Sequence, residues 1–338
     1  MIAFTICSNN YYHQARVLAA SWLRHHPESR FFVILVDRVQ AGLPYDVDPR
    51  VQVIPLEDLG LDALPTLVQK YNIIELNTAV KPDAFFHLFR LTGATKILYL
   101  DPDIKVYSRL SEVESLLDEH DIVLTPHYTT PIADGKSSDD LVILNSGLFN
   151  LGFIGLSNLA AVTPFLSWWR ERLYAYGYFN QSKGMFYDQA WCNCVPVFFD
   201  NYAILKHPGY NMANWNLHER TLSEQDGEYR VNGVYPLRFF HFSGFRFTHP
   251  EQISHYHNRF TFETRPDIVG LYQAYREDQA ENHAERFRTV PCHYYEEHKR
   301  YVAAQAAAAW QALPWRTKLR RTLVSRAIKT YYRLRKMF

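Results

Sequence analysis

Residues 2–36 read IAFTICSNNYYHQARVLAASWLRHHPESRFFVILV, and this stretch decides the fold class. Ile2–Cys7 is a short apolar run typical of a strand. Apolar side chains then recur with helical spacing over residues 15–23, and Phe31–Val36 is the continuous apolar run of a strand buried on both faces. The β-prone residues 51–54 follow. This order predicts an α/β fold that begins as a doubly wound parallel sheet, with ligands beyond the carboxyl ends of the strands.

The rest of the chain continues the pattern and then changes character. Helices are expected over residues 72–93, interrupted at Lys81-Pro82, and around residues 162–173. Further strands are expected at residues 97–100, 122–125, 148–154, 197–205 and 235–242. Beyond residue 250 the pattern becomes helical and polar. The expected organisation is a catalytic domain over residues 1–250, a helical appendage over 251–315 and a basic tail over 316–338.

Composition excludes some classes of protein. With 338 residues, 47% of them hydrophobic, the chain can bury a large core. Its net charge of +1 disfavours a nucleic-acid binder. Nine Lys and Arg and no acidic residue lie within residues 316–338, whereas the remainder carries a net charge of −8. Leu319, Leu323, Leu334 and Phe338 fall on one side of a helix there, which predicts binding to an anionic membrane surface; docking onto the acidic body is the alternative.

The cysteines and the lack of long apolar runs indicate where in the cell the protein is expected. Four cysteines do not form a disulfide framework, and Cys192-Asn193-Cys194 lacks zinc-knuckle spacing, so packed free thiols are expected. No secretory leader or run of about 18 apolar residues is visible. The expected location is the cytoplasm, with peripheral attachment at the inner face of the plasma membrane.

Asp101-Pro102-Asp103 directly follows the apolar run Ile97–Leu100. Two carboxylates at i and i+2, where a buried strand ends, can turn toward one hard cation, and Mg²⁺ or Mn²⁺ takes such oxygen ligands while keeping positions for a diphosphate. Asp and Pro are also ordinary turn residues, so a plain turn is the alternative.

Five segments together resemble the GT-A glycosyltransferases, notably the family-8 retaining enzymes. They occur in the family's order across residues 4–244: Phe4-Thr5-Ile6-Cys7-Ser8-Asn9-Asn10-Tyr11, Lys96-Ile97-Leu98-Tyr99-Leu100-Asp101-Pro102-Asp103, Asn145-Ser146-Gly147-Leu148-Phe149-Asn150, Tyr187-Asp188-Gln189 and His241-Phe242-Ser243-Gly244. The resemblance implies a GT-A, Rossmann-like α/β fold, with a mixed, mainly parallel sheet flanked by helices and a helical C-terminal extension. It also implies transfer of a sugar from a nucleotide donor.

The resemblance implies a role for each matching residue. Asp101, Asp103 and His241 would hold Mn²⁺ or Mg²⁺. The nucleotide-binding loop would include Thr5, with Ser8 and Tyr11 on the uracil. The sugar hydroxyls would be held by Asn145, Gly147 and Asp188, with Gln189 on the β-face of the anomeric carbon. Donor binding would also use Lys81, Gly244 and Arg246, with Lys81 near the diphosphate.

Two positions depart from the family pattern. The family usually has a carboxylate where this chain has Ser8, and a lysine where it has Phe247. Arg246 is the neighbouring cation. Trp215 is a candidate for the wall of an acceptor site.

The function expected from the sequence is metal-dependent transfer from a UDP-sugar to a glycan acceptor, a lipid-linked surface polysaccharide or lipopolysaccharide, with retention. A sugar-1-phosphate nucleotidyltransferase is an alternative, although residues 5–14 contain no glycine to cradle a triphosphate. A catalytically silent sugar-nucleotide-binding scaffold is another. Asp101, Asp103 and His241 favour an enzyme.

Overall fold

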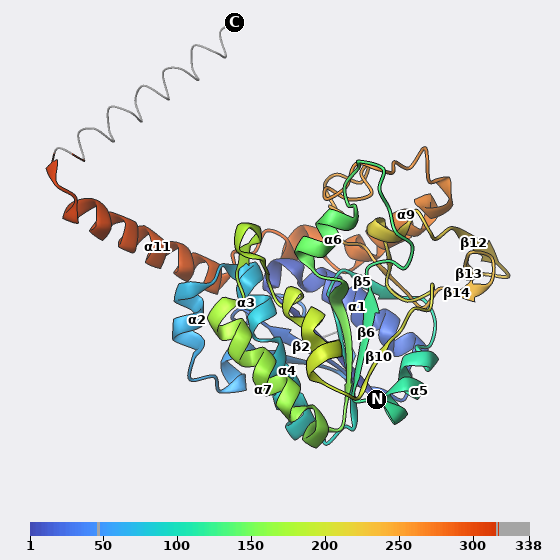
Figure 1. Cartoon of the computed structure of the whole chain (residues 1–338), viewed down its shortest axis with the longest axis horizontal. Helices are drawn as coiled ribbons and strands as arrows, with labels where there is room; N and C mark the ends of the chain where they lie inside the picture. The colour runs from blue at the N-terminus through green and yellow to red at the C-terminus, as the bar shows by residue number, and fades with distance from the viewer. Residues whose placement is uncertain (46–47, 316, 318–338) are drawn as a thin grey trace, which may run out of the picture.

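The computed structural model describes residues 1–45, 48–315 and 317, and Figure 1 shows their arrangement. Its centre is a seven-stranded sheet in the order β10-β6-β7-β4-β1-β2-β3. The strands are β1 (Ile2–Cys7), β2 (Phe31–Leu35), β3 (Val51–Pro55), β4 (Lys96–Leu100), β6 (Ile122–Pro126), β7 (Phe149–Ser157) and β10 (Tyr202–Ile204).

One strand of this sheet runs against the others. β1, β2, β3 and β4 pair in parallel, as do β6 and β10, whereas β7 is antiparallel to both β4 and β6. The beginning of β7 therefore lies beside the carboxyl end of β4. The prediction of a mixed, mainly parallel sheet is confirmed.

Helices cover both faces of the sheet. One face carries α2 (Leu64–Lys70), α3 (Ile73–Ala79), α4 (Lys81–Thr92) and α7 (Leu159–Tyr176), and the other carries α1 (Tyr12–His25) and α5 (Ser111–Glu119). Side chains of β1 alternate between these layers, with Phe4 and Ile6 on the first and Ala3 and Cys7 on the second. Burying a large side chain such as Trp22 or Trp169 contributes about 1.5–3 kcal/mol.

A small second sheet lies next to the first. It has the order β11-β15-β5, formed by β11 (Met212–Ala213), β15 (Phe239–His241) and β5 (Ile104–Val106). Phe240 and Phe242 pack against Tyr272 and Tyr275 of α9 (Val269–Glu281), in a third buried cluster. α9 thus supports the strand that ends at His241.

The remaining elements are short, apart from the last helix. They are α6 (Asp140–Ser146), β8 (Phe179–Asn180), β9 (Met185–Phe186), α8 (Val195–Phe198), β12 (Leu222–Gln225), β13 (Glu228–Val231), β14 (Tyr235–Pro236) and α10 (Ala284–Phe287). α11 (His293–Ala312) starts against α2, where Tyr294 is buried, and then leads away from the body with residues 299–312 exposed. In the described part of the chain no helix combines the length and hydropathy needed to cross a membrane. The expected membrane-binding tail, residues 316–338, lies almost entirely outside the described residues.

Two expected strands differ in the structure. The expectation for residues 197–205 was wrong at its start, since Pro196 lies in the first turn of α8 and only Tyr202–Ile204 is a strand. The run 235–242 is divided, because β14 and β15 belong to different sheets.

Candidate metal centre and donor site

Asp101 and Asp103 lie where β4 ends and β5 begins. The Asp101 N–H donates to the Gly152 carbonyl at 2.8 Å, and the Ile104 N–H closes a turn on the Asp101 carbonyl at 3.1 Å. The backbone of residues 101–104 therefore does form the turn that the alternative interpretation expected. Both carboxylates are half-buried at this edge.

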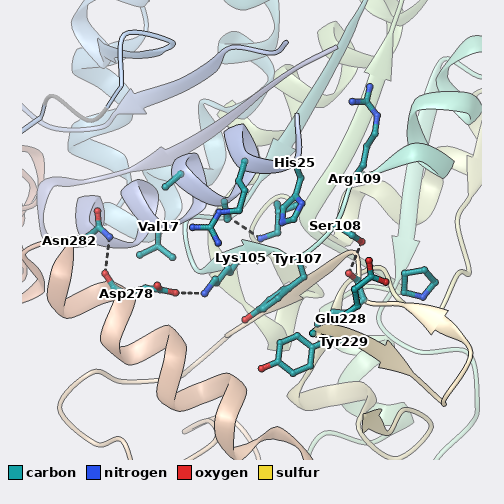
Figure 2. Close-up of a pocket in the computed structure, with 17 residues that line it drawn as sticks. Val17, His25, Lys105, Tyr107, Ser108, Arg109, Glu228, Tyr229, Asp278 and Asn282 are labelled. Carbon is teal, nitrogen blue, oxygen red and sulfur yellow. Dashed lines mark hydrogen bonds and ion pairs between the residues drawn. The ribbon is translucent and has the colours of Figure 1, made fainter. Parts of the chain in front are cut away.

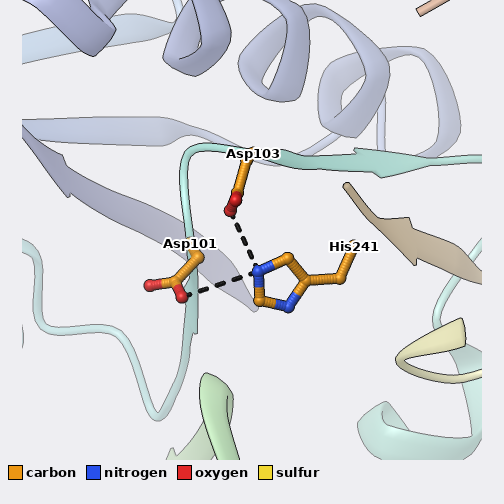
Figure 3. A group of neighbouring side chains, drawn as sticks. All are labelled: Asp101, Asp103 and His241. Carbon is orange, nitrogen blue, oxygen red and sulfur yellow. Dashed lines mark ion pairs between the residues drawn. The ribbon is translucent and has the colours of Figure 1, made fainter. Parts of the chain in front are cut away.

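His241 reaches the two carboxylates because β15 pairs antiparallel with β5, with His241 opposite Ile104. Its Nε2 lies 3.0 Å from an oxygen of Asp103 and 3.8 Å from an oxygen of Asp101. Figure 3 shows the imidazole aimed between the two carboxylates. One donor atom from each residue can be chosen so that all three lie within 4.8 Å of one another. Two carboxylates and an imidazole form a donor set that fits Mn²⁺ or Mg²⁺.

The charges within this cluster are strongly coupled. Burial raises the pKa of Asp101, against the opposing effects of Lys81 and His241. For His241 burial acts to lower the pKa, but the charge of Asp103 and its hydrogen bond outweigh this and raise the pKa above its ordinary value. A divalent cation bound to these residues would displace a proton from the imidazole, because a metal ligates the neutral ring.

Gly152 of β7 makes room for the cluster. A Cβ at this position would lie 2.4 Å from the His241 ring and 2.8 Å from oxygens of Asp101 and Asn150. The Asn150 amide oxygen accepts from Asn211 at 3.0 Å, and Asn211 Oδ1 lies 3.4 Å from the second ring nitrogen of His241. These residues form a buried polar layer behind the metal ligands. Only Asn150 belonged to a motif quoted from the sequence; nothing in the local sequence pointed to Gly152 or Asn211.

Lys81 and Asp188 form a buried ion pair next to this layer. Lys81 Nζ also donates to the Leu151 carbonyl at 2.9 Å and lies 4.0 Å from the centre of the Tyr99 ring. The Tyr99 hydroxyl in turn donates to Asp101. The structure thus connects Lys81, the expected diphosphate cation, with Asp188, the expected sugar ligand, and links the pair to the metal cluster through one tyrosine.

Gln189 is buried beside Asp188 and is fixed at both ends of its amide. Its Nε2 donates to the Ser146 carbonyl at 2.8 Å, and its Oε1 accepts from the Leu151 N–H at 3.3 Å. A Cβ on Gly147 would lie 2.7 Å from the Gln189 side chain, so Gly147, with φ of 124°, is required here. Asn145 is placed differently: it is exposed on α6, and its amide donates to the Leu141 carbonyl of the same helix.

The first loop brings Tyr11 toward the cluster. Thr5 and Ser8 are buried, and Ser8 donates to Asn10 at 2.6 Å, whereas the Tyr11 ring is half exposed. Burial raises the pKa of Tyr11, and the charge of Asp103 adds to this while Arg246 opposes it. Because β1 and β4 are parallel neighbours, the loop after β1 lies at the same sheet edge as Asp101. A carboxylate does lie nearby, on the adjacent strand end, but Asp37 is occupied by backbone N–H groups.

Arg246 is exposed, whereas Phe247 packs toward the C-terminal helices. The guanidinium of Arg276 lies 5.3 Å from the Phe247 ring, and that of Arg288 lies 5.9 Å from it, so the ring points toward the C-terminal helices. The charge of Arg246 opposes the rise in the pKa of Tyr11. Gly244, with φ of 74°, makes the turn between His241 and Arg246.

Trp215 supports the metal histidine from outside the donor set. Its ring contacts His241 edge-on with centroids 5.1 Å apart, and His127 at 5.3 Å. Only 6% of Trp215 is exposed. In this structure it packs the imidazole in place.

A cleft of about 600 Å³ lies between α1, β5, β13 and α9 (Figure 2). Tyr107 and Tyr229 contact each other in it, and Lys105 pairs with Asp278. None of the expected site residues lines this cleft. It is separate from the donor site.

The sequence matches no protein-family profile. It is 29% identical over 189 residues to the uncharacterised protein YfnF of Bacillus subtilis (strain 168), a match covering 54% of this chain and 59% of YfnF. It is 25% identical over 250 residues to the uncharacterised protein YfnD of the same organism, covering 71% and 76%. The chain therefore spans less than two thirds of YfnF.

Solved structures similar to this chain include glycosyltransferases, the group that its motifs resemble. They include the galactosyltransferase LgtC in complex with donor and acceptor sugar analogues, at 16% identity and a TM-score of 0.46 over 86% of this chain and 98% of LgtC. The glycosyltransferase GlyE of Streptococcus pneumoniae TIGR4 has 14% identity and a TM-score of 0.48, over 86% of this chain and 65% of the GlyE chain. Mouse xyloside xylosyltransferase 1 has 15% identity and a TM-score of 0.43, over 71% of this chain and 97% of the mouse chain. Likeness at this level says nothing about substrate.

Proposed function

We propose that the protein is a metal-dependent glycosyltransferase that moves a sugar from a UDP-sugar to a glycan acceptor. The observation that carries the proposal is the convergence of Asp101, Asp103 and His241 at the carboxyl edge of the sheet. Ligands of open α/β sheets bind at that edge. The same edge holds Tyr11, which offers an exposed ring to the base.

Each residue group has a task in this proposal. A divalent cation on Asp101, Asp103 and His241 would neutralise the diphosphate as it leaves. Lys81 and Asp188 would orient the sugar, because their buried charges resist reorganisation. Tyr11 would cover the uracil.

We propose retention of configuration, which the resemblance to the family-8 enzymes implies. The Asp188 carboxylate is already engaged by Lys81, and Gln189 offers a neutral amide that holds two backbone groups. Among the described residues of this site, neither is arranged as a covalent carboxylate nucleophile. We therefore propose attack by the acceptor hydroxyl on the leaving-group side.

The acceptor and location are proposed from the sequence of the tail. Its nine basic residues, at about 1 kcal/mol each near an anionic surface, would hold the acidic body at a membrane reversibly. We propose a lipid-linked surface polysaccharide or lipopolysaccharide as the acceptor, met at the cytoplasmic face. Sedimentation with anionic vesicles at low salt tests this, and absence of binding would contradict it.

The decisive experiment is donor hydrolysis and transfer with UDP-sugars, with and without Mn²⁺. Asp103→Asn removes a metal ligand, and Asp62→Asn, at an exposed position, is the matched control. Metal-dependent UDP release by the protein and by the Asp62→Asn variant, but not by the Asp103→Asn variant, supports the proposal. Release of pyrophosphate from a nucleoside triphosphate and a sugar 1-phosphate would favour the nucleotidyltransferase. Mn²⁺-dependent UDP-sugar binding without turnover would favour the scaffold.

A further inference from the structure

Residues 254–256 lie directly against Gly244, at the exit of the strand that carries His241. The His255 N–H donates to the Gly244 carbonyl at 3.1 Å, and the His255 ring nitrogen lies 2.7 Å from the same oxygen. A Cβ on Gly244 would lie 2.6 Å from the Tyr256 ring and 2.3 Å from Ser254 Oγ. The Tyr256 ring therefore covers Gly244, while 60% of Tyr256 stays exposed.

A second set of contacts fixes the other side of this segment. The Arg259 guanidinium makes two hydrogen bonds to Asp134, at 2.8 and 2.9 Å, and its side chain is 5% exposed. Ser137 and Asn258 also bond to each other through their backbones and the Asn258 side chain. Bidentate pairs of this kind hold a defined orientation. The Asp134–Arg259 pair thus ties the segment to the loop before α6.

Tyr256 lies next to the expected donor site, because its ring packs on Gly244, three residues after His241, and most of the residue is exposed. The charge of Asp103 adds to the effect of burial in raising the pKa of Tyr256, and Arg246 opposes it, which agrees with this position. Phe247 points away, so the family's lysine has no counterpart at that position.

We propose that Tyr256 is a donor-binding residue whose hydroxyl donates a hydrogen bond to the diphosphate. The Asp134–Arg259 pair is its positioning element. Together with Arg246, Tyr256 supplies contacts that this chain would otherwise lack at the Phe247 position. This inference rests on the proposed function, because it needs a nucleoside diphosphate at the site.

Binding of UDP and of uridine, measured by calorimetry in Mn²⁺, tests the hydroxyl. Tyr256→Phe should weaken UDP about tenfold, the scale of one hydrogen bond to a charged group, and leave uridine affinity unchanged. Tyr295→Phe, an exposed tyrosine on α11, is the matched control and should change neither. Equal UDP affinity for Tyr256→Phe and the unaltered protein would overturn the proposal.

The same measurements separate this inference from the proposed function. Mn²⁺-dependent UDP binding that Asp103→Asn abolishes but Tyr256→Phe leaves intact would keep the function and refute the role of Tyr256. No UDP binding by any form would refute both. Equal losses of UDP and uridine affinity would mean a general disturbance of the loop and would also refute the hydrogen bond.

The positioning pair has its own test. Arg259→Ala should raise the KM for the donor while changing kcat less than twofold, because it loosens Tyr256 without touching the sugar. In a Tyr256→Phe background the same change should have little further effect on UDP affinity. Full additivity of the two changes would show that Arg259 acts elsewhere.

Discussion

The Lys81 ammonium and the Asp188 carboxylate pair with each other while only 2% and 5% of their side chains are exposed. The pair sits between the sheet and α7, where the Trp169 indole N–H donates to the Asp188 carbonyl at 3.2 Å. Two residues far apart in sequence are thereby locked beside the metal cluster. Both charges are buried, so the pair has consequences for both stability and activity.

Removing one member of this pair should destabilise the protein strongly. Lys81→Met leaves the Asp188 charge buried, which costs about 3–5 kcal/mol of unfolding free energy. The double variant Lys81→Met with Asp188→Leu should recover much of that loss, because no charge is left buried. Urea unfolding measures both, and a double variant less stable than Lys81→Met would contradict this account.

Asp188→Asn should reduce turnover more than donor affinity. The amide keeps the size of the side chain but weakens hydrogen bonds that strengthen as the sugar flattens in the transition state. Steady-state kinetics provide the kcat and KM values, and calorimetry provides the affinity. A rise in donor KM with unchanged kcat would mean that Asp188 contributes only to ground-state binding.

Gly152→Ala should abolish tight metal binding while the protein still folds. The added methyl group would overlap His241 and the oxygens of Asp101 and Asn150, so one of these groups must move. Titration with Mn²⁺ followed by thermal shift measures the effect. Gly60→Ala is a control with open space around the added atom, although its φ of 65° carries strain of its own. Unchanged Mn²⁺ affinity in Gly152→Ala would contradict this prediction, because it would show that the ion still binds after these side chains have moved.

Mn²⁺ should raise the melting temperature of the protein, and UDP should add to this. A ligand present at 100 times its Kd stabilises the folded state by about 2.7 kcal/mol. EDTA should remove the increase, and Asp103→Asn should lack it. An equal increase in Asp103→Asn would mean that the ion binds at another site.

Acid should destabilise the protein partly through His26. Burial lowers the pKa of His26 to about 4, and its Nε2 accepts a hydrogen bond from the Leu110 N–H, which a protonated ring cannot do. Between pH 6.5 and 4, His26 is therefore protonated in the unfolded chain but largely neutral in the folded protein. Stability falls by about 1.4 kcal/mol per pH unit for this residue as the pH decreases through that window.

His26→Gln should flatten this dependence, since glutamine does not titrate. Unfolding free energies at pH 6.5, 5.5 and 4.5 measure the slope, with the exposed His249→Gln as control. An unchanged slope in His26→Gln would assign the acid sensitivity to other groups.

The sequence was most informative where chemistry and a strand end coincide. Asp101 and Asp103 directly follow the apolar run of a buried strand. Their place at the edge of the sheet could therefore be predicted from that run and from the turn-forming residues after it. The partnership with His241 could not, because it depends on an antiparallel pairing of β15 with β5 between residues far apart in the chain. The resemblance to known motifs supplied it.

Other features had no local signal at all. Gly152 matters only because three side chains converge on it, and Tyr256 matters only because residues 134–137 hold its loop against Gly244. The fragment 197–205 misled because Val, Phe and Ile favour strands in isolation, while Pro196 starts a helical turn. Such features follow from packing rather than from spacing.

The late position of β15 has a consequence for synthesis. All seven strands of the main sheet are complete by Ile204, whereas His241 is added afterwards by a strand that pairs outside that sheet. Chains fold from the N-terminus as they leave the ribosome. The sheet can therefore form on a nascent chain before His241 joins Asp101 and Asp103, and the candidate metal site is complete only once β15 has paired with β5.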